Sequence, residues 1–378
     1  MADTAYGVGA SEAVKLWSQK LAREALRKTY IKNFMGPSSD NLIQIKPETS
    51  KGPGDRVRVT LRMQLTGDGV QGDGMQEGNE EALTTYTDDL LINQLRHAVR
   101  SEGKMTEQRI PFEIREEAMM GLSDWWADRW DQWFFNQVCG YMAQTDTRYT
   151  GHNTVITPST TSGNEHQVWP AAIANDQSLS TAGGTDTTHC FSLTLIDKAV
   201  EKAKTVTPPI RPIVVDGEKW FVVFLHPFQT TSLRTQPSTA TAQVTWYDLQ
   251  KSLLQGSGSV KNPIFTGALG TYNGCILHES YRVTQGANSS TNAAITTARR
   301  AVLCGAQAAI AAFGEGHDKN SYDWFEQLFD YGNKLGVKAG CISGLKKSSY
   351  TVTVSGTSAA TDFGTIVMSS KAIAGNIP

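Results

Sequence analysis

One alternating segment with a glycine-rich tip constrains this chain more than any other feature. In residues 56–65 an apolar residue alternates with a polar one, which predicts a strand with one apolar and one cationic face. Four glycines follow within residues 67–74, and a second β-prone run returns at 83–87. A two-stranded ribbon is marginally stable alone in water. We therefore expect this ribbon to rest on its own body or on a neighbouring copy.

Charged residues along the ribbon suggest what such a contact would use. The cationic face carries Arg56, Arg58 and Arg62, and the returning segment carries Glu77, Glu80 and Glu81. Charges of both signs can pair across a contact between copies. These six residues are candidate inter-subunit contacts.

The N-terminal segment has the pattern of a basic amphipathic helix. In residues 11–32, apolar residues recur every three or four positions, and six lysines or arginines stand against two acids, Glu12 and Glu24. The segment is either an ordinary surface helix or an arm that lies on another subunit or faces packaged nucleic acid. Trp17, Lys20 and Arg23 are its candidate contact residues.

A long aromatic-rich helix is predicted over residues 112–142. Tryptophans at 126, 130 and 133 fall on one arc of the helix, which indicates burial from several sides. Asp124, Asp128 and Asp131 fall on the opposite arc, where a solvated face is the expectation. Packing of this acidic arc against the basic N-terminal segment is a further hypothesis, although surface charge pairs contribute little.

The remaining segments predict a mixture of loops and strands. Residues 147–190 are rich in Ser, Thr and Gly and read as long loops with short strands. The continuous apolar run at 220–225 predicts a strand in the middle of a sheet. Segments near 275–283, 301–310 and 336–342, together with 363–368, add further strands. The fold class is therefore α+β.

Composition excludes several classes of protein. The net charge of −2 argues against a protein that coats nucleic acid, and the low charged fraction of 19% suits self-association. No apolar run approaches the length of a membrane span, and the start of the chain has no secretory pattern. The five cysteines are scattered without a CxxC, so we expect buried thiols.

Candidate catalytic and metal-binding residues form no coherent pattern. His226 follows a buried strand, and a hydrolase pairing it with Asp216, Glu218 or Asp248 is one alternative. A histidine that caps the strand by bonding a backbone carbonyl is the preferred interpretation. The acids of the glycine-rich tip miss the spacing of a calcium loop, and the chain has no phosphate-binding glycine motif. We expect no catalytic, cofactor or metal site.

Several segments, in this order, make the chain resemble the N4-like family of major capsid proteins of tailed phages. The likeness spans most of residues 11–345. The segments that carry it are Trp17–Leu21, the ribbon from Gly54 to Thr87, Asn93–Val99, Leu122–Arg129, and Phe224–Pro227 through Arg234.

The resemblance implies an HK97-like capsid fold. It implies an N-terminal arm in 1–50, an E-loop hairpin with flanking strands in 51–103, and a P-domain spine helix in 104–146. The Ser/Thr-rich insert 147–190 would precede an A-domain with a central sheet in 191–315. Closing P-domain strands and a tail would occupy 316–378.

The implied function is assembly of an icosahedral shell around a double-stranded DNA genome. Copies would form pentamers and hexamers. Scaffold, portal and decoration proteins would be partners, and contact with DNA would be non-specific. The chain would be made in the bacterial cytoplasm and end in the virion. An encapsulin-like compartment or another virion component, such as a tail or decoration protein, are the alternatives with a structural role.

One departure from some capsids of this fold concerns covalent linkage. Some of them lock through a lysine in the E-loop, whereas this chain has no lysine between Lys51 and Lys104. The resemblance combined with this departure predicts a shell held by non-covalent contacts.

Overall fold

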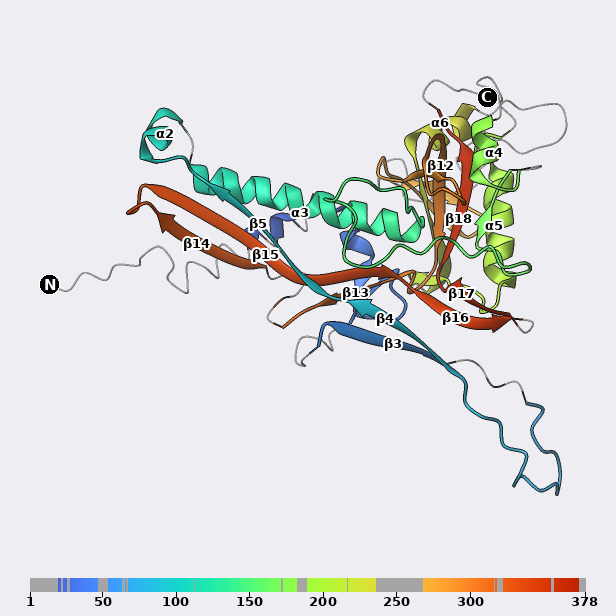
Figure 1. Ribbon diagram of the computed structural model, residues 1–378. Coiled ribbons are helices and arrows are strands. Elements are labelled where there is room, and N and C mark those ends of the chain that lie inside the picture. The colour runs from blue at the N-terminus through green and yellow to red at the C-terminus, as the bar shows by residue number, and fades with distance from the viewer. Residues whose placement is uncertain are drawn as a thin grey trace.

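Two sheets and one long helix organise the chain (Figure 1). The computed structural model describes residues 20–46, 54–170, 173–181, 189–235, 268–315, 317, 322–354 and 357–373, apart from positions 22, 26, 27, 63, 64, 66, 112 and 216.

The long helix, α3 (Ile114–Val138), runs from one end of the molecule to the eight-stranded sheet (Figure 1). Its large side chains are buried, as the sequence predicts. Those that are at most 5% exposed include Trp126, Trp130, Trp133, Phe134 and Phe135. Burial of this many aromatic rings supplies a large part of the apolar area removed from water on folding.

The helix ends earlier than residue 142 because Gly140 stops it. Gly140 has φ +62°, a left-handed conformation that glycine adopts without steric cost. The N–H of Gly140 then donates to the carbonyl of Gln137 (3.2 Å), and the N–H of Tyr141 donates to that of Asn136 (2.9 Å). This is a Schellman motif, and it satisfies carbonyls that the helix end would otherwise leave unpaired.

The first sheet has six strands, in the order β1-β2-β13-β15-β14, with β5 paired to β15. Their bounds are β1 Met35–Gly36, β2 Ile43–Lys46, β13 Ala309–Phe313, β15 Lys334–Lys347, β14 Asp323–Phe329 and β5 Asn93–Arg100. The first half of β15 pairs with β14, and its second half pairs with β13. This strand of 14 residues therefore holds the sheet together.

The two faces of β15 have different neighbours. Val337, Ala339 and Cys341 belong to the core that α3 forms with this sheet. Even-numbered residues point the other way, since successive side chains of a strand alternate between faces. On that outward face Ile342 packs against a hairpin made of β3 (Arg56–Arg62) and β4 (Thr85–Leu91).

The second sheet has eight strands, and its central path is β6-β18-β12-β8-β10-β9. β11 pairs with β12, and β7 pairs with β8. The bounds are β6 Gln167–Val168, β7 Ile213–Val215, β8 Glu218–Leu225, β9 Ala268–Tyr272, β10 Cys275–Glu279, β11 Gln285–Ala287, β12 Ala294–Cys304 and β18 Thr365–Lys371. The apolar run at 220–225 is thus in the middle of a sheet, as predicted.

Helices cover both faces of the second sheet. Alternate residues of β8, Val223 and Leu225, pack against α5 (Leu193–Thr205). Phe224 faces the other way, and its ring centre lies 5.9 Å from that of Phe134 and 5.5 Å from that of Phe135 in α3. The aromatic end of α3 therefore contributes to the cores of both sheets.

Strand β18 differs from the sequence-based division of the chain. That division puts residues 316–378 with closing strands of the P-domain, whereas β18 lies between β6 and β12 in the second sheet. All seven residues of β18 are buried, including Ile366, Val367 and Met368, because both of its faces pack against apolar neighbours. The order of segments along the chain does not show that the chain returns to the second sheet after the strands of the first.

Shorter elements join these parts. They are the 3₁₀ helix η1 Tyr30–Phe34, α2 Lys104–Arg109, α4 Asp176–Thr181, α6 Pro227–Thr235, β16 Ser349–Val354 and β17 Thr357–Asp362. Between the sheets, Lys347 and Asp362 form an ion pair of 2.8 Å whose side chains are 0% and 1% exposed. Removing either partner would leave a buried charge uncompensated, which is costly.

The insert 147–190 is loop-rich, as expected, but its described residues include the short helix α4. A buried ion pair between Asp176 and Arg300 (2.8 Å) fastens α4 to β12. All five cysteines are buried, and none of them forms a disulfide. Among the described residues, none of the helices has the length and apolar character needed to cross a membrane.

Gly344 tests the contact between the hairpin and the first sheet. A Cβ at this position would lie 2.1 Å from the carbonyl oxygen of Leu91 in β4. We expect Gly344→Ala to lower the free energy of unfolding by about 1–3 kcal/mol through overpacking. Denaturant unfolding measures this change.

Gly121→Ala is the matched control. Gly121 lies in α3 with open space around it. There the added methyl group should raise stability by roughly 0.5–1 kcal/mol, since alanine favours the helix. Equal stability of Gly344→Ala and the wild type would contradict the close approach of β4.

Candidate inter-subunit surfaces

The β3–β4 hairpin has a root that its own chain supports. Val57 and Val59 are 4% and 7% exposed, and they pack with Ile310, Ala312 and Ile342 of the first sheet. Lys346 of β15 also forms an ion pair with Asp88 of β4. The root is therefore part of the folded subunit. Of the two supports expected from the sequence, the chain's own body and a neighbouring copy, the root uses the first.

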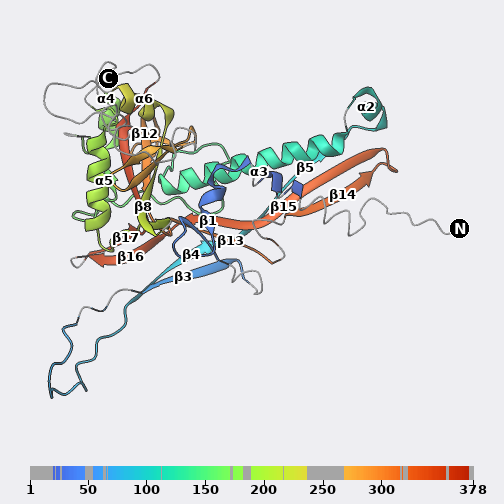
Figure 2. The same cartoon turned by 180° about the vertical axis from the view of Figure 1, so that it is seen from behind.

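The hairpin tip, residues 65–84, extends away from the body (Figures 1 and 2). The described residues of the tip form no strand, and all except the half-buried Val70 are exposed. Leu65, Met75 and Leu83 are 56%, 72% and 57% exposed. Exposed apolar side chains gathered on one segment are a feature of protein–protein interaction sites.

Acidic residues dominate the tip. It carries Asp68, Asp73, Glu77, Glu80 and Glu81, and it has neither lysine nor arginine. The carboxylate of Glu81 accepts the N–H of Gly67 (2.7 Å), and that of Glu80 accepts the N–H of Gly78 (2.8 Å). Two of the three predicted contact glutamates thus also shape the loop itself.

Arg58 has a partner in its own chain. Its guanidinium donates to both carboxylate oxygens of Asp89 on the facing strand, at 2.8 and 3.2 Å. The hydrogen bond from Arg58 lowers the pKa of Asp89. The Arg58 side chain is still 68% exposed, and its contact with a neighbouring subunit stays a prediction. Arg56 and Arg62 lie on the same exposed face.

The N-terminal segment packs against α3. The described residues between 20 and 28 are helical, and Leu21 and Ala25 are 0% and 1% exposed within the α3 core. Lys20 and Arg23 are exposed, as predicted, whereas Trp17 lies outside the described residues. Lys28 forms an ion pair with Asp124 (2.6 Å), so the hypothesis that the basic and acidic stretches pack together is confirmed for this pair.

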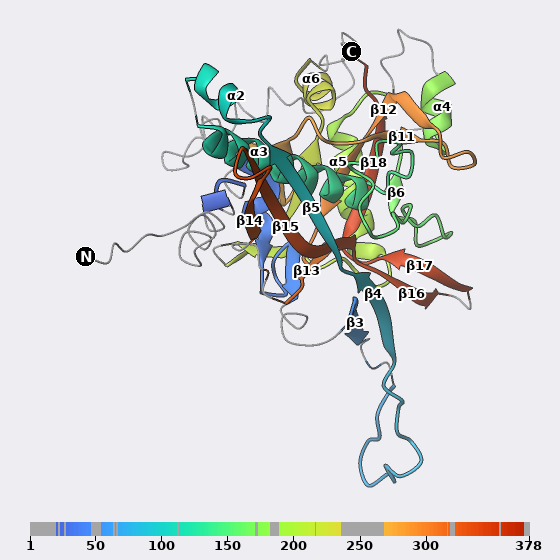
Figure 3. The same cartoon turned by 60° about the vertical axis from the view of Figure 1, so that its left-hand side comes forward.

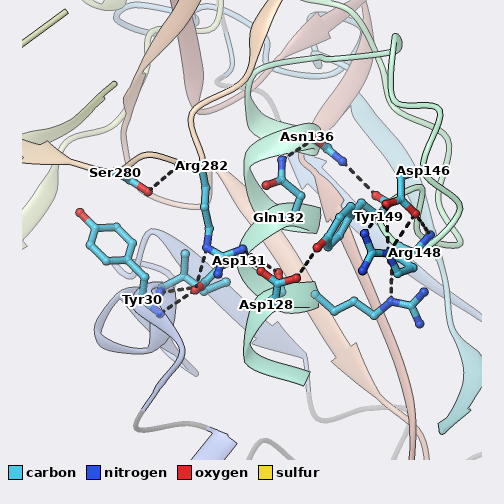
Figure 4. Close-up of polar contacts among 12 residues, drawn as sticks. Tyr30, Asp128, Asp131, Gln132, Asn136, Asp146, Arg148, Tyr149, Ser280 and Arg282 are labelled. Atoms are coloured by element: carbon cyan, nitrogen blue, oxygen red, sulfur yellow. Dashed lines mark hydrogen bonds and ion pairs between the residues drawn. The ribbon is translucent and has the colours of Figure 1, made fainter. Parts of the chain in front are cut away.

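Asp131 holds the end of this segment in place, as Figure 4 shows. Its two carboxylate oxygens accept the backbone N–H groups of Tyr30 (3.0 Å) and Ile31 (3.2 Å), at the start of η1. These N–H groups have no partner within a helix, so the carboxylate caps η1 from a distant part of the chain.

The prediction of a solvated acidic face is wrong for Asp131, which is 2% exposed. Arg282 bridges Asp131 (3.7 Å) and Asp128, and the hydroxyl of Tyr149 donates to Asp128 (Figure 4). Burial, the largest influence, raises the pKa of Asp131 to about 6, although both backbone hydrogen bonds and Arg282 oppose the rise.

Asp124, Asp128 and Asp131 therefore each face a cation of the chain. Their negative charges are therefore balanced by cations of the same subunit. In the described part of the chain, no group of three or more His, Cys, Asp or Glu side chains is placed to hold a metal ion.

His226 is positioned as part of the fold. Its ring nitrogen Nδ1 accepts the backbone N–H of Phe228 (3.2 Å) at the start of α6, rather than bonding a carbonyl as the sequence analysis proposed. Burial lowers its pKa to about 4, with a smaller contribution from Arg299. The ring is therefore neutral at pH 7.

None of the acids proposed for the hydrolase alternative lies near His226 among the described residues. Glu218 and His226 lie at opposite ends of β8, about 26 Å apart at the rise of a strand. Asp216 and Asp248 lie outside the described residues.

Comparison with known proteins connects these surfaces to one family. A family model described as phage capsid protein matches residues 5–374. The chain is 29% identical over 358 residues to the major capsid protein of Pseudomonas phage KPP25, covering 90% of both sequences.

Solved structures agree. The capsid of Ralstonia phage GP4 is similar, with a TM-score of 0.74 and 30% identity over 100% of both chains. The capsid of cyanophage Pam1 has a TM-score of 0.65 and 19% identity, covering 99% of this chain and 100% of that one, and so shows the fold alone. These matches do not resolve the narrower N4-like group, which stays a prediction.

The raised pKa of Asp131 gives a pH dependence with a definite sign. The folded protein binds this proton more tightly than the unfolded chain, so the free energy of unfolding falls as pH rises through about 6. From pH 5 to 7 this residue should lower it by about 1 kcal/mol. Urea unfolding of the wild type and Asp131→Asn at both pH values measures the difference.

Asp124→Asn serves as the control, because the Asp124 side chain is 64% exposed. That variant should keep the pH dependence of the wild type. If wild type and Asp131→Asn had parallel stability profiles between pH 5 and 7, the buried carboxylate would not titrate as described.

Proposed function

The chain belongs to the phage capsid protein family and has the HK97-like fold, and from that premise we propose that it is a major capsid protein whose copies assemble into an icosahedral shell around double-stranded DNA. The observation that carries this proposal is the hairpin tip. It exposes the apolar side chains of Leu65, Met75 and Leu83. Figure 3 shows that this segment projects away from the described body of the subunit.

Assembly needs contacts that repeat around rings. Identical subunits that meet through different surfaces close into cyclic assemblies when the rotation between them permits. Five-fold and six-fold rings of this kind build an icosahedral shell. Each contact can be weak, because a subunit held by several neighbours at once gains effective affinity without any new contact.

The hairpin tip would lie over an adjacent subunit, as the E-loop of the family resemblance implies. Arg56 and Arg62 remain proposed contacts with acids of that neighbour, together with Glu77 in the tip. Glycines with positive φ, such as Gly69 and Gly72, let the loop adopt conformations that other residues disfavour. Such a loop can follow the different curvature of pentamers and hexamers.

The shell would be held without covalent cross-links from this loop. No lysine lies between Lys51 and Lys104, so the loop offers no amine for such a bond. Lys20, Arg23 and Trp17 in the N-terminal arm are proposed to add further non-covalent contacts.

Other parts of the proposal rest on the family resemblance. Scaffold, portal and decoration proteins would be partners, and packaged DNA would be contacted non-specifically. The chain would be made in the cytoplasm of the bacterial host. An encapsulin-like compartment shares the fold, and cargo enzymes in place of a genome inside purified particles would identify it.

Deletion of residues 66–79 tests the role of the tip. We expect the subunit to fold with an unchanged melting temperature, because the supported root at Val57, Val59 and Leu90 is retained. Closed particles should be lost. Sedimentation velocity and electron microscopy of the deletion variant and of the full chain measure the amounts of free subunit and of closed particles.

An equal-length Gly-Ser replacement of the same residues separates chain length from side-chain chemistry. It should also fail to close shells, since it removes Met75 and three of the five acids of the tip, Asp68, Asp73 and Glu77. Normal particles from the deletion variant would contradict the proposal. A wild-type chain that stays a 41.2 kDa monomer and loses a hydrolytic activity in His226→Ala would favour the enzyme alternative.

A further inference from the structure

Two buried ion pairs of this fold differ in how their carboxylates are hydrogen-bonded. Asp176, which is 3% exposed, accepts hydrogen bonds from the side chains of Gln167 (3.0 Å), Trp169 (3.0 Å) and Arg300 (2.8 Å) and from the N–H of Ala287 (3.1 Å). Four donors of this kind compensate a buried carboxylate for the water that it loses on folding. Asp176 is therefore a buried charge with a full set of partners.

Asp362 is buried without such partners. Its side chain is 1% exposed and that of Lys347 is 0% exposed, and the Lys347 amine lies 2.8 Å from Oδ1 of Asp362. Among the described residues, neither oxygen of this carboxylate accepts a hydrogen bond, because the amine approaches outside the directions of one. The amine itself donates to the carbonyl of Ile156 (2.8 Å). A carboxylate desolvated in this way is costly to keep charged.

The backbone holds the two groups together at the open end of the β16–β17 hairpin. Asp362 stands opposite Ser349 in the register of the two strands, and Lys347 precedes Ser349 by two residues. The N–H of Phe363 also donates to the carbonyl of Ser348 (3.0 Å). The amine and the carboxyl group are thus fixed at contact distance on paired strands, an arrangement that favours reaction between them.

We propose that Lys347 and Asp362 join in an isopeptide bond within one chain. The amine nitrogen of Lys347 attacks the carboxyl carbon of Asp362, a C–N bond forms, and one C–O bond breaks. The oxygen leaves as water with two of the three protons of the ammonium group. No other reagent is consumed, and a neutral amide replaces two charges in a site shielded from solvent. The bond lies inside the subunit and is separate from the contacts between copies.

His166 places a base in the same part of the core. It is 0% exposed, and its Nδ1 lies 3.1 Å from the carbonyl oxygen of Asn164. Burial lowers the pKa of His166, and the charges of Asp362, which raises it, and Lys347, which lowers it, also act on the ring. The neutral ring therefore donates from Nδ1 to Asn164. Its buried Nε2, which has no partner within the described residues, is left to carry a proton from the amine to the leaving oxygen.

The neighbouring lysine provides a comparison within the same chain. Lys346 forms an ion pair with Asp88, and these side chains keep some contact with water, at 14% and 11% exposed. The carboxylate of Asp88 accepts a hydrogen bond from this amine and another from the N–H of Ser349 (3.3 Å). Because its charge is hydrogen-bonded and partly hydrated, we expect Lys346 to keep a free amine.

Tryptic peptides of the denatured wild-type protein test the proposal without any variant. Trypsin cleaves after lysine and should cut after Lys346 but not after Lys347, whose amine is acylated. Residues 347–371 should then appear as one peptide, lighter than its sequence by one water. Its fragmentation spectrum should lack breaks between Lys347 and Asp362, because a ring opened once stays in one piece.

Lys347→Arg is the matched variant, because arginine keeps the positive charge but does not form this amide. Its peptide with Asp362 should have the full mass of its sequence, whereas Lys346→Arg should still lose one water. In His166→Leu we expect the light peptide to appear at least tenfold more slowly after pulse-labelled expression, and a rate equal to that of the wild type would remove His166 from the reaction.

Two results would overturn the isopeptide bond. One is a wild-type peptide that is cut after Lys347 and has its full mass. The other is the same loss of water in Lys347→Arg, which would place the dehydration elsewhere. Closed particles built from a chain of full mass would leave the proposed function in place, so the two proposals fail separately.

Discussion

The burial of aromatic side chains along one helix is the interaction on which the rest of the structure depends. Trp126 and Trp130 of α3 pack under the six-stranded sheet, whereas Phe134 and Phe135 meet Phe224 of the eight-stranded sheet. A single helix therefore supplies core to both sheets and fixes one against the other. Because this core is continuous, the body of the subunit has a hydrophobic core of its own.

A division between body and periphery follows from that core. The hairpin root belongs to the body, since Val57 and Val59 are buried against the sheet and Gly344 lets β4 approach it. The described residues of the tip form no strand, and nearly all of them are exposed. Its apolar residues and acids are free to be used between copies. Folding and assembly thus depend on different residues of the same hairpin, and substitutions in one set need not disturb the other.

The sequence predicts features that follow from local periodicity. Alternation in residues 56–65 locates β3 and its buried face, and the spacing of tryptophans locates α3. Interactions between distant segments escape such patterns. Asp131 was placed on a solvated face, yet it shares a helical stripe with Ala127 and Val138, and this neighbourhood could have indicated its burial. The pairing of Arg58 with Asp89 depends on strand register, and the position of β18 depends on which edge of the sheet remains available.

The composition of the hairpin tip also bears on survival outside the cell. Projecting loops are where proteases most readily cut a folded chain. Trypsin and its relatives cleave after lysine or arginine, and residues 63–95, between Arg62 and Arg96, contain neither. This projecting segment therefore offers no cleavage site to trypsin-like proteases, whereas glutamate-specific proteases retain targets in it.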